Sequence, residues 1–184
     1  AQSVANYLTE QVKAGAQALM IFDTWGGMLP DGWYQRISLE SMRNVINQLP
    51  REVNGQKVPV IVFTKGGGLW LEDMADCGAD VIGLDWTMSL ARARSILVSK
   101  NKPLALQGNL DPLSLFANPE QITHEASTIL DSLANAPALR PELHPLDGHI
   151  FNLGHGISQF TNPDSVTVLA KTVIEHSERL RKAK

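Results

Sequence analysis

Residues 58–63 read VPVIVF, a run of strand length in which every side chain is apolar or a proline ring. The run is followed by Thr64, Lys65 and three glycines. A strand with one face in water alternates apolar and polar residues, whereas a strand covered on both faces is apolar throughout. This stretch therefore predicts a buried strand of a parallel sheet, followed by a turn.

Four other short runs are also apolar and of strand length. Segments in which apolar residues recur at helical spacing lie between the five runs. The other runs are residues 18–22, 80–84, 103–107 and 149–153. Helices are expected over residues 1–16, 34–49, 69–77, 90–98, 119–133 and from 163 onward. The last two begin with asparagine followed by proline, which is a helix-start signal.

Alternating strands and helices predict βα units with a parallel sheet and right-handed crossovers. Two architectures stay open, a doubly wound sheet and part of a (β/α)8 barrel. Five units are too few to close an eight-stranded barrel. Because a buried strand follows the first helix at once, the chain is expected to begin inside a fold.

Composition bounds the function only loosely. The chain has 184 residues, which suits one domain, and 43% of them are hydrophobic. A net charge of -3 calls for neither nucleic acid nor an anionic membrane as partner. Cys77 is the single cysteine, which fits a reducing compartment and excludes an internal disulfide or a multi-cysteine metal site. No signal peptide is expected, and no run is apolar enough to span a bilayer.

Polar residues and glycines follow every predicted strand. In both architectures ligands bind beyond the carboxyl ends of the strands, so these residues predict a site. They are found at positions 23–27, 64–68, 85–87, 108–111 and 154–156. His155 lies between two glycines, and from the residues alone it could act as a general acid, a metal ligand, an anion-binding group or a structural hydrogen-bonding residue.

Other features at these positions favour ordinary structural roles. Residues 65–68 (KGGG) lack the spacing of known phosphate-binding loops, so a tight βα turn is expected. Asp111 before Pro112 is typical of a helix cap. Asp23 and Asp85 could do acid-base work or pair with a cation, although separate loops fix no distance between them. The four tryptophans, Trp25, Trp33, Trp70 and Trp86, are expected to be packing residues and not platforms for a ligand.

Five motifs, taken in order, resemble the uroporphyrinogen decarboxylase family of haem biosynthesis. They are FDTWGG (residues 22–27), IVFTKGGG (61–68), VIGLDWT (81–87), LALQGNLDP (104–112) and FNLGHGI (151–157). The resemblance runs from about residue 12 to the C-terminal helix. The pair QGNLDP and NLGHG is highly specific.

The resemblance implies a fold, an activity and a cellular setting. It implies a (β/α)8 barrel, of which this chain is the C-terminal five or so units within a single domain. The family is a cytoplasmic homodimer that removes carbon dioxide from the four acetate side chains of uroporphyrinogen III, which gives coproporphyrinogen III. It needs no cofactor or metal, because the protonated substrate is its own electron sink. The expected partners are therefore the tetrapyrrole and the missing N-terminal half, with neither nucleic acid nor membrane.

Three residues match substrate-binding positions of the family. Thr24 matches the hydroxyl position that binds a substrate carboxylate, and His155 matches the histidine that does the same. Phe22 matches an apolar contact beside the tetrapyrrole. The family's catalytic aspartate, its arginine-rich motif and a functional tyrosine lie in its N-terminal half. None of these motifs is found here, so no catalytic residue is expected in this chain, and the chain alone is expected to be inactive.

Two alternatives come from different functional classes. A cobalamin- or coenzyme-M-type methyltransferase of the same superfamily would bind zinc through cysteine and histidine. The matching strand end, residues 63–66 (FTKG), offers no cysteine. The second alternative is a non-catalytic half-barrel fragment, whose open sheet edges would need a cover.

Overall fold

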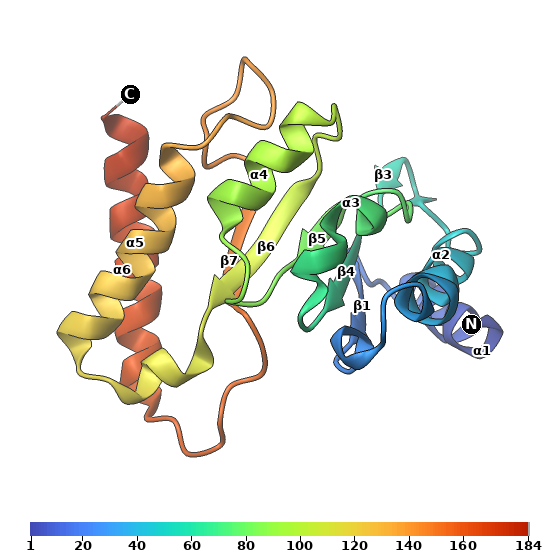
Figure 1. Cartoon of the computed structure of the whole chain (residues 1–184), viewed down its shortest axis with the longest axis horizontal. Coiled ribbons are helices and arrows are strands. Elements are labelled where there is room, and N and C mark those ends of the chain that lie inside the picture. The colour runs from blue at the N-terminus through green and yellow to red at the C-terminus, as the bar shows by residue number, and fades with distance from the viewer. Residues whose placement is uncertain (184) are drawn as a thin grey trace. The chain divides into compact units, whose positions relative to one another are not determined.

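The computed structural model describes residues 1–183, which form two compact units, one that ends at Gly83 and one that begins at Leu84 (Figure 1). Within the described residues both units are built from parallel βα units, as the sequence predicts. The assignment of the whole chain to a single domain stays a prediction. Among residues 1–183, no helix combines the length and the apolar character needed to cross a membrane.

The first unit contains three parallel strands, short helices and a small hairpin. In chain order its elements are α1 (Gln2–Lys13), β1 (Leu19–Asp23), η1 (Gly26–Met28), η2 (Tyr34–Leu39), α2 (Glu40–Ile46), β2 (Glu52–Val53), β3 (Gln56–Lys57), β4 (Val60–Thr64), η3 (Gly67–Trp70), α3 (Leu71–Met74) and β5 (Val81–Gly83).

Strand β4 lies between β1 and β5, and all three run parallel. Val60 and Val62 of β4 are fully buried, which confirms the prediction from VPVIVF. Asp23 pairs in register with Thr64, so the loops after β1 and β4 leave the sheet side by side. β1 departs from the prediction, because Phe22 is 65% exposed and one face of this strand is open.

The predicted helix over residues 34–49 has two parts. It begins as the π-helix η2 and continues as α2. The wider winding of a π-helix shifts the buried face. As a result Tyr34, Ser38 and Leu39 are buried, whereas Ile37 is 49% exposed.

The hairpin β2–β3 was not predicted. Its turn holds Asn54 and Gly55, with φ angles of 52° and 77°. A two-residue hairpin turn of this kind needs positive φ angles at both positions, and the Asn-Gly pair is its sequence signal.

The second unit contains two parallel strands and three longer helices. Its elements are α4 (Leu90–Ser99), β6 (Ala105–Leu110), η4 (Pro112–Phe116), α5 (Pro119–Ala134), β7 (His149–Leu153) and α6 (Pro163–Lys182). β6 pairs with β7 in register from Leu106–His149 to Leu110–Leu153. β6 is longer than predicted, so Gly108 and Asn109 lie within the strand and not after it.

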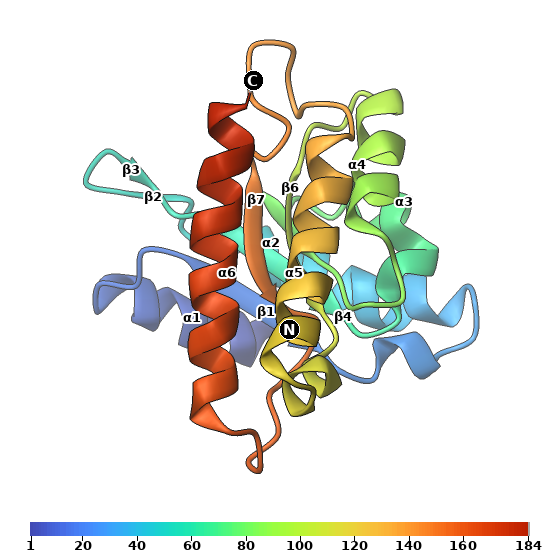
Figure 2. The same ribbon diagram turned by 90° about the vertical axis from the view of Figure 1, so that its left-hand side faces the viewer.

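Helices α5 and α6 run side by side over β7, as Figure 2 shows. The asparagine caps are present: Asn118 accepts a hydrogen bond from the amide of Gln121, and Asn162 from that of Asp164. Between the helices the core holds Leu110, Leu115, Ile122, Ala126 and Leu169.

Burial in this layer differs in part from the pattern that the sequence predicts. Burial on β7 alternates, and Ile150 is 45% exposed, so the prediction that both faces of this strand are covered was wrong. Val166, in the first turns of α6, is 39% exposed. His176 has a structural role, since its Nε2 lies 2.6 Å from Oδ1 of Asp131.

The proline-rich connection after α5 is anchored by a buried arginine. Arg94 on α4 is fully buried, and its guanidinium donates hydrogen bonds to the carbonyls of Pro145, Asp147 and Gly148 at 3.1–3.3 Å. The segment is therefore held to the rest of the second unit directly before β7 begins. Burial, which disfavours the charged form, lowers the pKa of Arg94, and Asp147 opposes this shift.

His149, which opens β7, predicts an acid sensitivity of the second unit. Its Nε2 lies 2.9 Å from the carbonyl oxygen of Gly108. Burial is the main cause of its lowered pKa, and nearby Arg94 adds to the shift. The unfolded chain therefore binds a proton more readily, at about pH 6.5, and stability is lost as the pH falls through that value. Urea unfolding from pH 8 to 5.5 should show a shallower loss in His149→Gln, whereas His124→Gln, on the exposed face of α5, should keep the wild-type slope.

Candidate functional site

Thr24 follows β1 directly and is half-buried at the start of a tight loop. The preceding carboxylate organises this loop. Oδ1 of Asp23 accepts a hydrogen bond from the amide of Trp25 at 3.3 Å, and Oδ2 accepts one from the hydroxyl of Ser38 in η2. Because Asp23 is tied to its own loop and to η2, the backbone that carries Thr24 is fixed at both ends. This arrangement gives Asp23 a positioning role.

The glycines of FDTWGG allow this loop to lie on the loop after β4. A Cβ atom on Gly27 would stand 2.0 Å from the backbone oxygen of Lys65, and one on Gly26 would stand 2.8 Å from Cγ2 of Thr64. Gly66 has a φ of 74° and begins a short 3-10 turn. The KGGG segment is thus the tight βα turn that the sequence predicts.

A buried polar pair lies under these loops. The hydroxyl of Tyr34 and that of Thr64 are 3.0 Å apart, and the Tyr34 ring stacks on Trp70 at 4.1 Å. Burial raises the pKa of Tyr34 to about 12, against the opposing hydrogen bond from Thr64. Tyr34 therefore acts here as a neutral hydrogen-bonding group. No sequence motif indicates the contact of Tyr34 with Thr64 or that of Ser38 with Asp23, although Tyr34 and Ser38 have the i, i+4 spacing of one helix face.

Loss of the Ser38 hydroxyl should weaken the first unit. Ser38 is 8% exposed and donates to Asp23, so Ser38→Ala leaves a carboxylate oxygen without its buried donor. We expect the free energy of unfolding to fall by about 1–2 kcal/mol. Denaturant unfolding measures this change, and Ser95→Ala on the exposed side of α4 is the control. An equal and small loss in both variants would contradict the positioning role of Asp23.

His155 follows β7 and is half-buried. The glycine before it packs on neighbouring backbone: a Cβ atom on Gly154 would stand 2.9 Å from the amide nitrogen of Trp86 and 3.0 Å from Cα of Asp85. The amide of Gly154 also donates to the carbonyl of Leu110 at 2.7 Å. No atom lies within 4 Å of the Cβ position of Gly156, so the chain after His155 borders open space.

Asp85 is used structurally. It is 2% exposed, and its Oδ1 accepts hydrogen bonds from the amide and the hydroxyl of Thr87, at 3.0 and 2.5 Å. The side-chain amide of Asn109 donates to the carbonyls of Asp85 and Met88, at 2.7 and 2.5 Å. These contacts fix the turn after residue 84 and favour a structural role for Asp85 over the acid-base role left open by the sequence.

The predicted site residues all lie at the carboxyl ends of strands. Phe22 and Thr24 belong to the first unit, on β1 and its loop, and His155 belongs to the second unit. The ring of Phe22 meets Phe63 edge to face at 5.9 Å and leaves most of its surface open. The prediction that the tryptophans pack holds for Trp70, which is 8% exposed, but was wrong for Trp25 and Trp33, which are 72% and 51% exposed. Trp86 is also partly open, at 38%.

The strand ends therefore carry exposed aromatic rings, the hydroxyl of Thr24 and the imidazole of His155. Among residues 1–183, no group of three or more His, Cys, Asp or Glu side chains is placed to hold a metal ion. Parallel βα units with such groups beyond their carboxyl ends define a parallel α/β fold, the class that includes (β/α)8 barrels and doubly wound sheets.

The comparisons narrow this class to one family. The sequence matches the family "Uroporphyrinogen decarboxylase (URO-D)" over residues 1–176. It is 56% identical to the uroporphyrinogen decarboxylase of Burkholderia thailandensis and 55% identical to that of Burkholderia cenocepacia, over 181 residues in each case. The chain belongs to the uroporphyrinogen decarboxylase family.

The same comparisons set the extent of the match. Each alignment covers 98% of this chain and 46% of the relative, so the chain spans about half the length of the curated relatives and corresponds to their C-terminal half. Among solved structures, a methyltransferase from Methanosarcina mazei superposes with a TM-score of 0.73 at 18% identity, over 95% of this chain and 46% of that one. This second likeness is one of fold alone.

Proposed function

We propose that this chain is the substrate-binding C-terminal half of a cytoplasmic uroporphyrinogen decarboxylase. The proposed reaction converts the four acetate side chains of uroporphyrinogen III to methyl groups and gives coproporphyrinogen III. The observation that carries the proposal is the 56% identity to the Burkholderia thailandensis enzyme over 98% of this chain. The longer protein, as a homodimer, would be the active form, and this half alone would be inactive.

The groups at the strand ends suit a large polyanion with an apolar ring system. In this proposal the hydroxyl of Thr24 and the imidazole of His155 donate hydrogen bonds to substrate carboxylates. The open face of Phe22, 65% exposed, lies beside the tetrapyrrole. Hydrogen bonds to charged groups are among the stronger ones, so each of these groups can contribute to substrate binding. No cofactor is required by this scheme.

In the proposed reaction the substrate's own pyrrole ring accepts the electrons that decarboxylation releases. Protonation of a pyrrole carbon next to an acetate arm makes a cation that accepts electrons. The bond between the carboxylate and its methylene breaks, carbon dioxide leaves, and the electron pair flows into the ring. A proton added to the exocyclic carbon and loss of the ring proton complete the methyl group. The protein's part is orientation and electrostatics.

A chimera tests the proposal. The matched 181 residues of the Burkholderia thailandensis enzyme are replaced by this chain, and products are separated by carboxylate number after oxidation. We expect the chimera to convert uroporphyrinogen III to coproporphyrinogen, and this chain alone to leave it unchanged. A folded chimera with no product would overturn the proposed function. The fold likeness to a methyltransferase favours no second activity.

A further inference from the structure

We infer that Trp86 is a positioning residue for His155, because its indole ring packs on Gly154 and holds the backbone that carries the imidazole. The inference rests on the proposed function in one respect: its kinetic effect is expected through the hydrogen bond of His155 to a substrate carboxylate. The packing itself is a property of the second unit, which contains all the residues involved.

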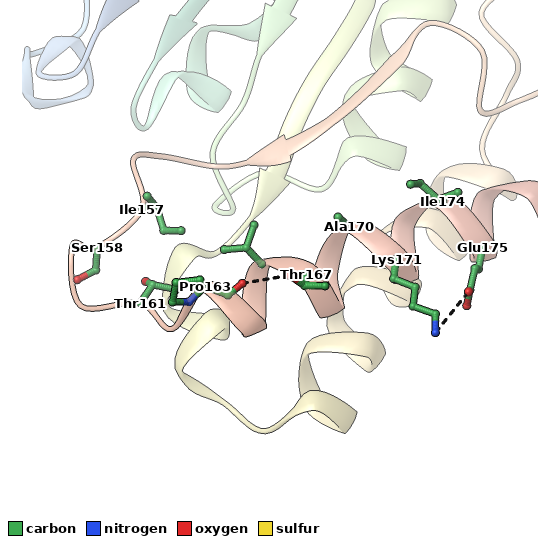
Figure 3. A pocket seen from close by; sticks show the side chains of 10 residues that line it. Ile157, Ser158, Thr161, Pro163, Thr167, Ala170, Lys171, Ile174 and Glu175 are labelled. Atoms are coloured by element: carbon green, nitrogen blue, oxygen red, sulfur yellow. Dashed lines mark hydrogen bonds and ion pairs between the residues drawn. The ribbon is translucent and has the colours of Figure 1, made fainter.

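The local sequence does not hold His155 in one place. Gly154 and Gly156 flank it, and glycine has access to a wider range of φ and ψ angles than any other residue. After the histidine, no atom lies within 4 Å of the Cβ position of Gly156, and Ile157 and Ser158 line a hollow of about 790 Å³ beside α6 (Figure 3). Packing that orders the imidazole is therefore expected on the Gly154 side.

Trp86 supplies a contact on that side. A Cβ atom on Gly154 would stand 2.9 Å from Cε3 of the Trp86 ring and 2.9 Å from the Trp86 amide nitrogen. Both the ring and the backbone of Trp86 therefore lie directly against the Gly154 backbone. The amide of Gly154 also donates a hydrogen bond to the carbonyl of Leu110, the last residue of β6, at 2.7 Å. Gly154 is thus held by the end of β6 and by the turn that carries Trp86.

The turn that carries Trp86 is fixed on both sides of the ring. Oδ1 of Asp85 accepts hydrogen bonds from the amide and the hydroxyl of Thr87, at 3.0 and 2.5 Å. The side-chain amide of Asn109 donates to the carbonyls of Asp85 and Met88, at 2.7 and 2.5 Å. A binding group keeps its place when the residues that support it are themselves held by packing and hydrogen bonds. The indole of Trp86 meets this condition.

Trp86 is not an ordinary core residue, since it is 38% exposed. It also lines a hollow of about 260 Å³, bordered by the start of α4, the end of β6 and one side of α5. Because space beside Trp86 is already open, a shorter side chain would lose the contact with Gly154, and no tightly packed neighbour would replace it. The loop that carries His155 would then gain freedom without the loss of a core side chain.

A double-mutant cycle in the chimera distinguishes positioning from a structural role alone. We expect Trp86→Leu to lower kcat/KM about fivefold or more, because a small displacement of a hydrogen-bonding group weakens its contact with the substrate. In the His155→Ala background the same change should cost less than about twofold, since the group that Trp86 positions is gone. Trp86→Phe, which keeps an aromatic ring at this point, should retain most of the activity. Phe116→Leu, at a 53% exposed site on η4, is the control and should behave like wild type in both backgrounds.

Hydrogen exchange of the chimera gives a second readout that needs no substrate. The amides of residues 154–157 should exchange faster in Trp86→Leu than in wild type, and at the wild-type rate in Phe116→Leu. Trp86→Met, which removes the ring but keeps an apolar side chain, is the second variant and should give the same pattern as Trp86→Leu.

Faster exchange at residues 154–157 together with the kinetic coupling to His155 supports the inference. Unchanged exchange there in both ring-less variants, or an equal kinetic loss with and without His155, would overturn it. A folded chimera that makes no product overturns the proposed function instead, and the exchange rates then decide by themselves whether Trp86 orders the loop.

Discussion

Gly27→Ala should reduce the free energy of unfolding of the first unit by more than about 3 kcal/mol, the largest effect of a single methyl group that we expect in this chain. The added Cβ would stand 2.0 Å from the backbone oxygen of Lys65, and 3.0 Å from its carbonyl carbon. Backbone cannot rotate away as a side chain can, so the loops after β1 and β4 would have to separate. Denaturant unfolding monitored by tryptophan fluorescence measures the loss.

Gly32→Ala is the matched control. Gly32 also lies in the first unit, but its Cβ position has no atom within 4 Å, and only its φ of 77° opposes a side chain. We expect a loss of about 1 kcal/mol there. If Gly27→Ala costs no more than Gly32→Ala, the two loops are not packed as the structure has them, and the fixed position of Thr24 loses its support.

His155→Ala should lower kcat/KM of the chimera by about 10- to 100-fold. In the proposed function this imidazole donates to a substrate carboxylate, and a hydrogen bond to a charged group contributes about 1.5–3 kcal/mol. The variant should keep its thermal stability, because His155 is half-buried and its loop is held by the packing of Gly154 on Asp85 and Trp86. Steady-state kinetics on uroporphyrinogen III, with thermal unfolding in parallel, separates the two effects.

His124→Ala serves as the control for this substitution. His124 is exposed on α5, away from the strand ends, and its replacement should leave the kinetics unchanged. Wild-type kinetics in His155→Ala would remove His155 from the site. A matching loss in His124→Ala would point to a general effect of histidine removal and would equally contradict the assigned role.

The sequence predicts the order of strands and helices well, because each of these elements depends on residues close together in the sequence. Buried parallel strands read as continuous apolar runs, and Asn-Pro pairs begin helices wherever the cap geometry is available, as at Asn118 and Asn162. What it does not predict depends on tertiary contacts. The π-helical start of the helix after Trp33 brings Tyr34 and Ser38 inward, and no periodicity of 3.6 residues indicates that winding.

The candidate site also has features that the sequence predicts and features that it does not. The resemblance places Thr24 and His155 at strand ends, where the structure has them, because the order of motifs fixes which loop follows which strand. It does not reveal that Asp23 is held by Ser38, or that Gly154 serves backbone packing, since both depend on residues distant in sequence. The open β7 face could not be read from HIFNL, whose apolar residues look the same on a covered strand.

Carbon dioxide release by the chimera is the most direct test of the proposed function. Uroporphyrinogen III labelled in its acetate carboxyl groups is incubated anaerobically with chimera that has been dialysed against a chelator. We expect four labelled carbon dioxide molecules for each coproporphyrinogen formed, with no added cofactor or metal. Release that requires an added cofactor or metal, or a folded chimera that releases none, would contradict it.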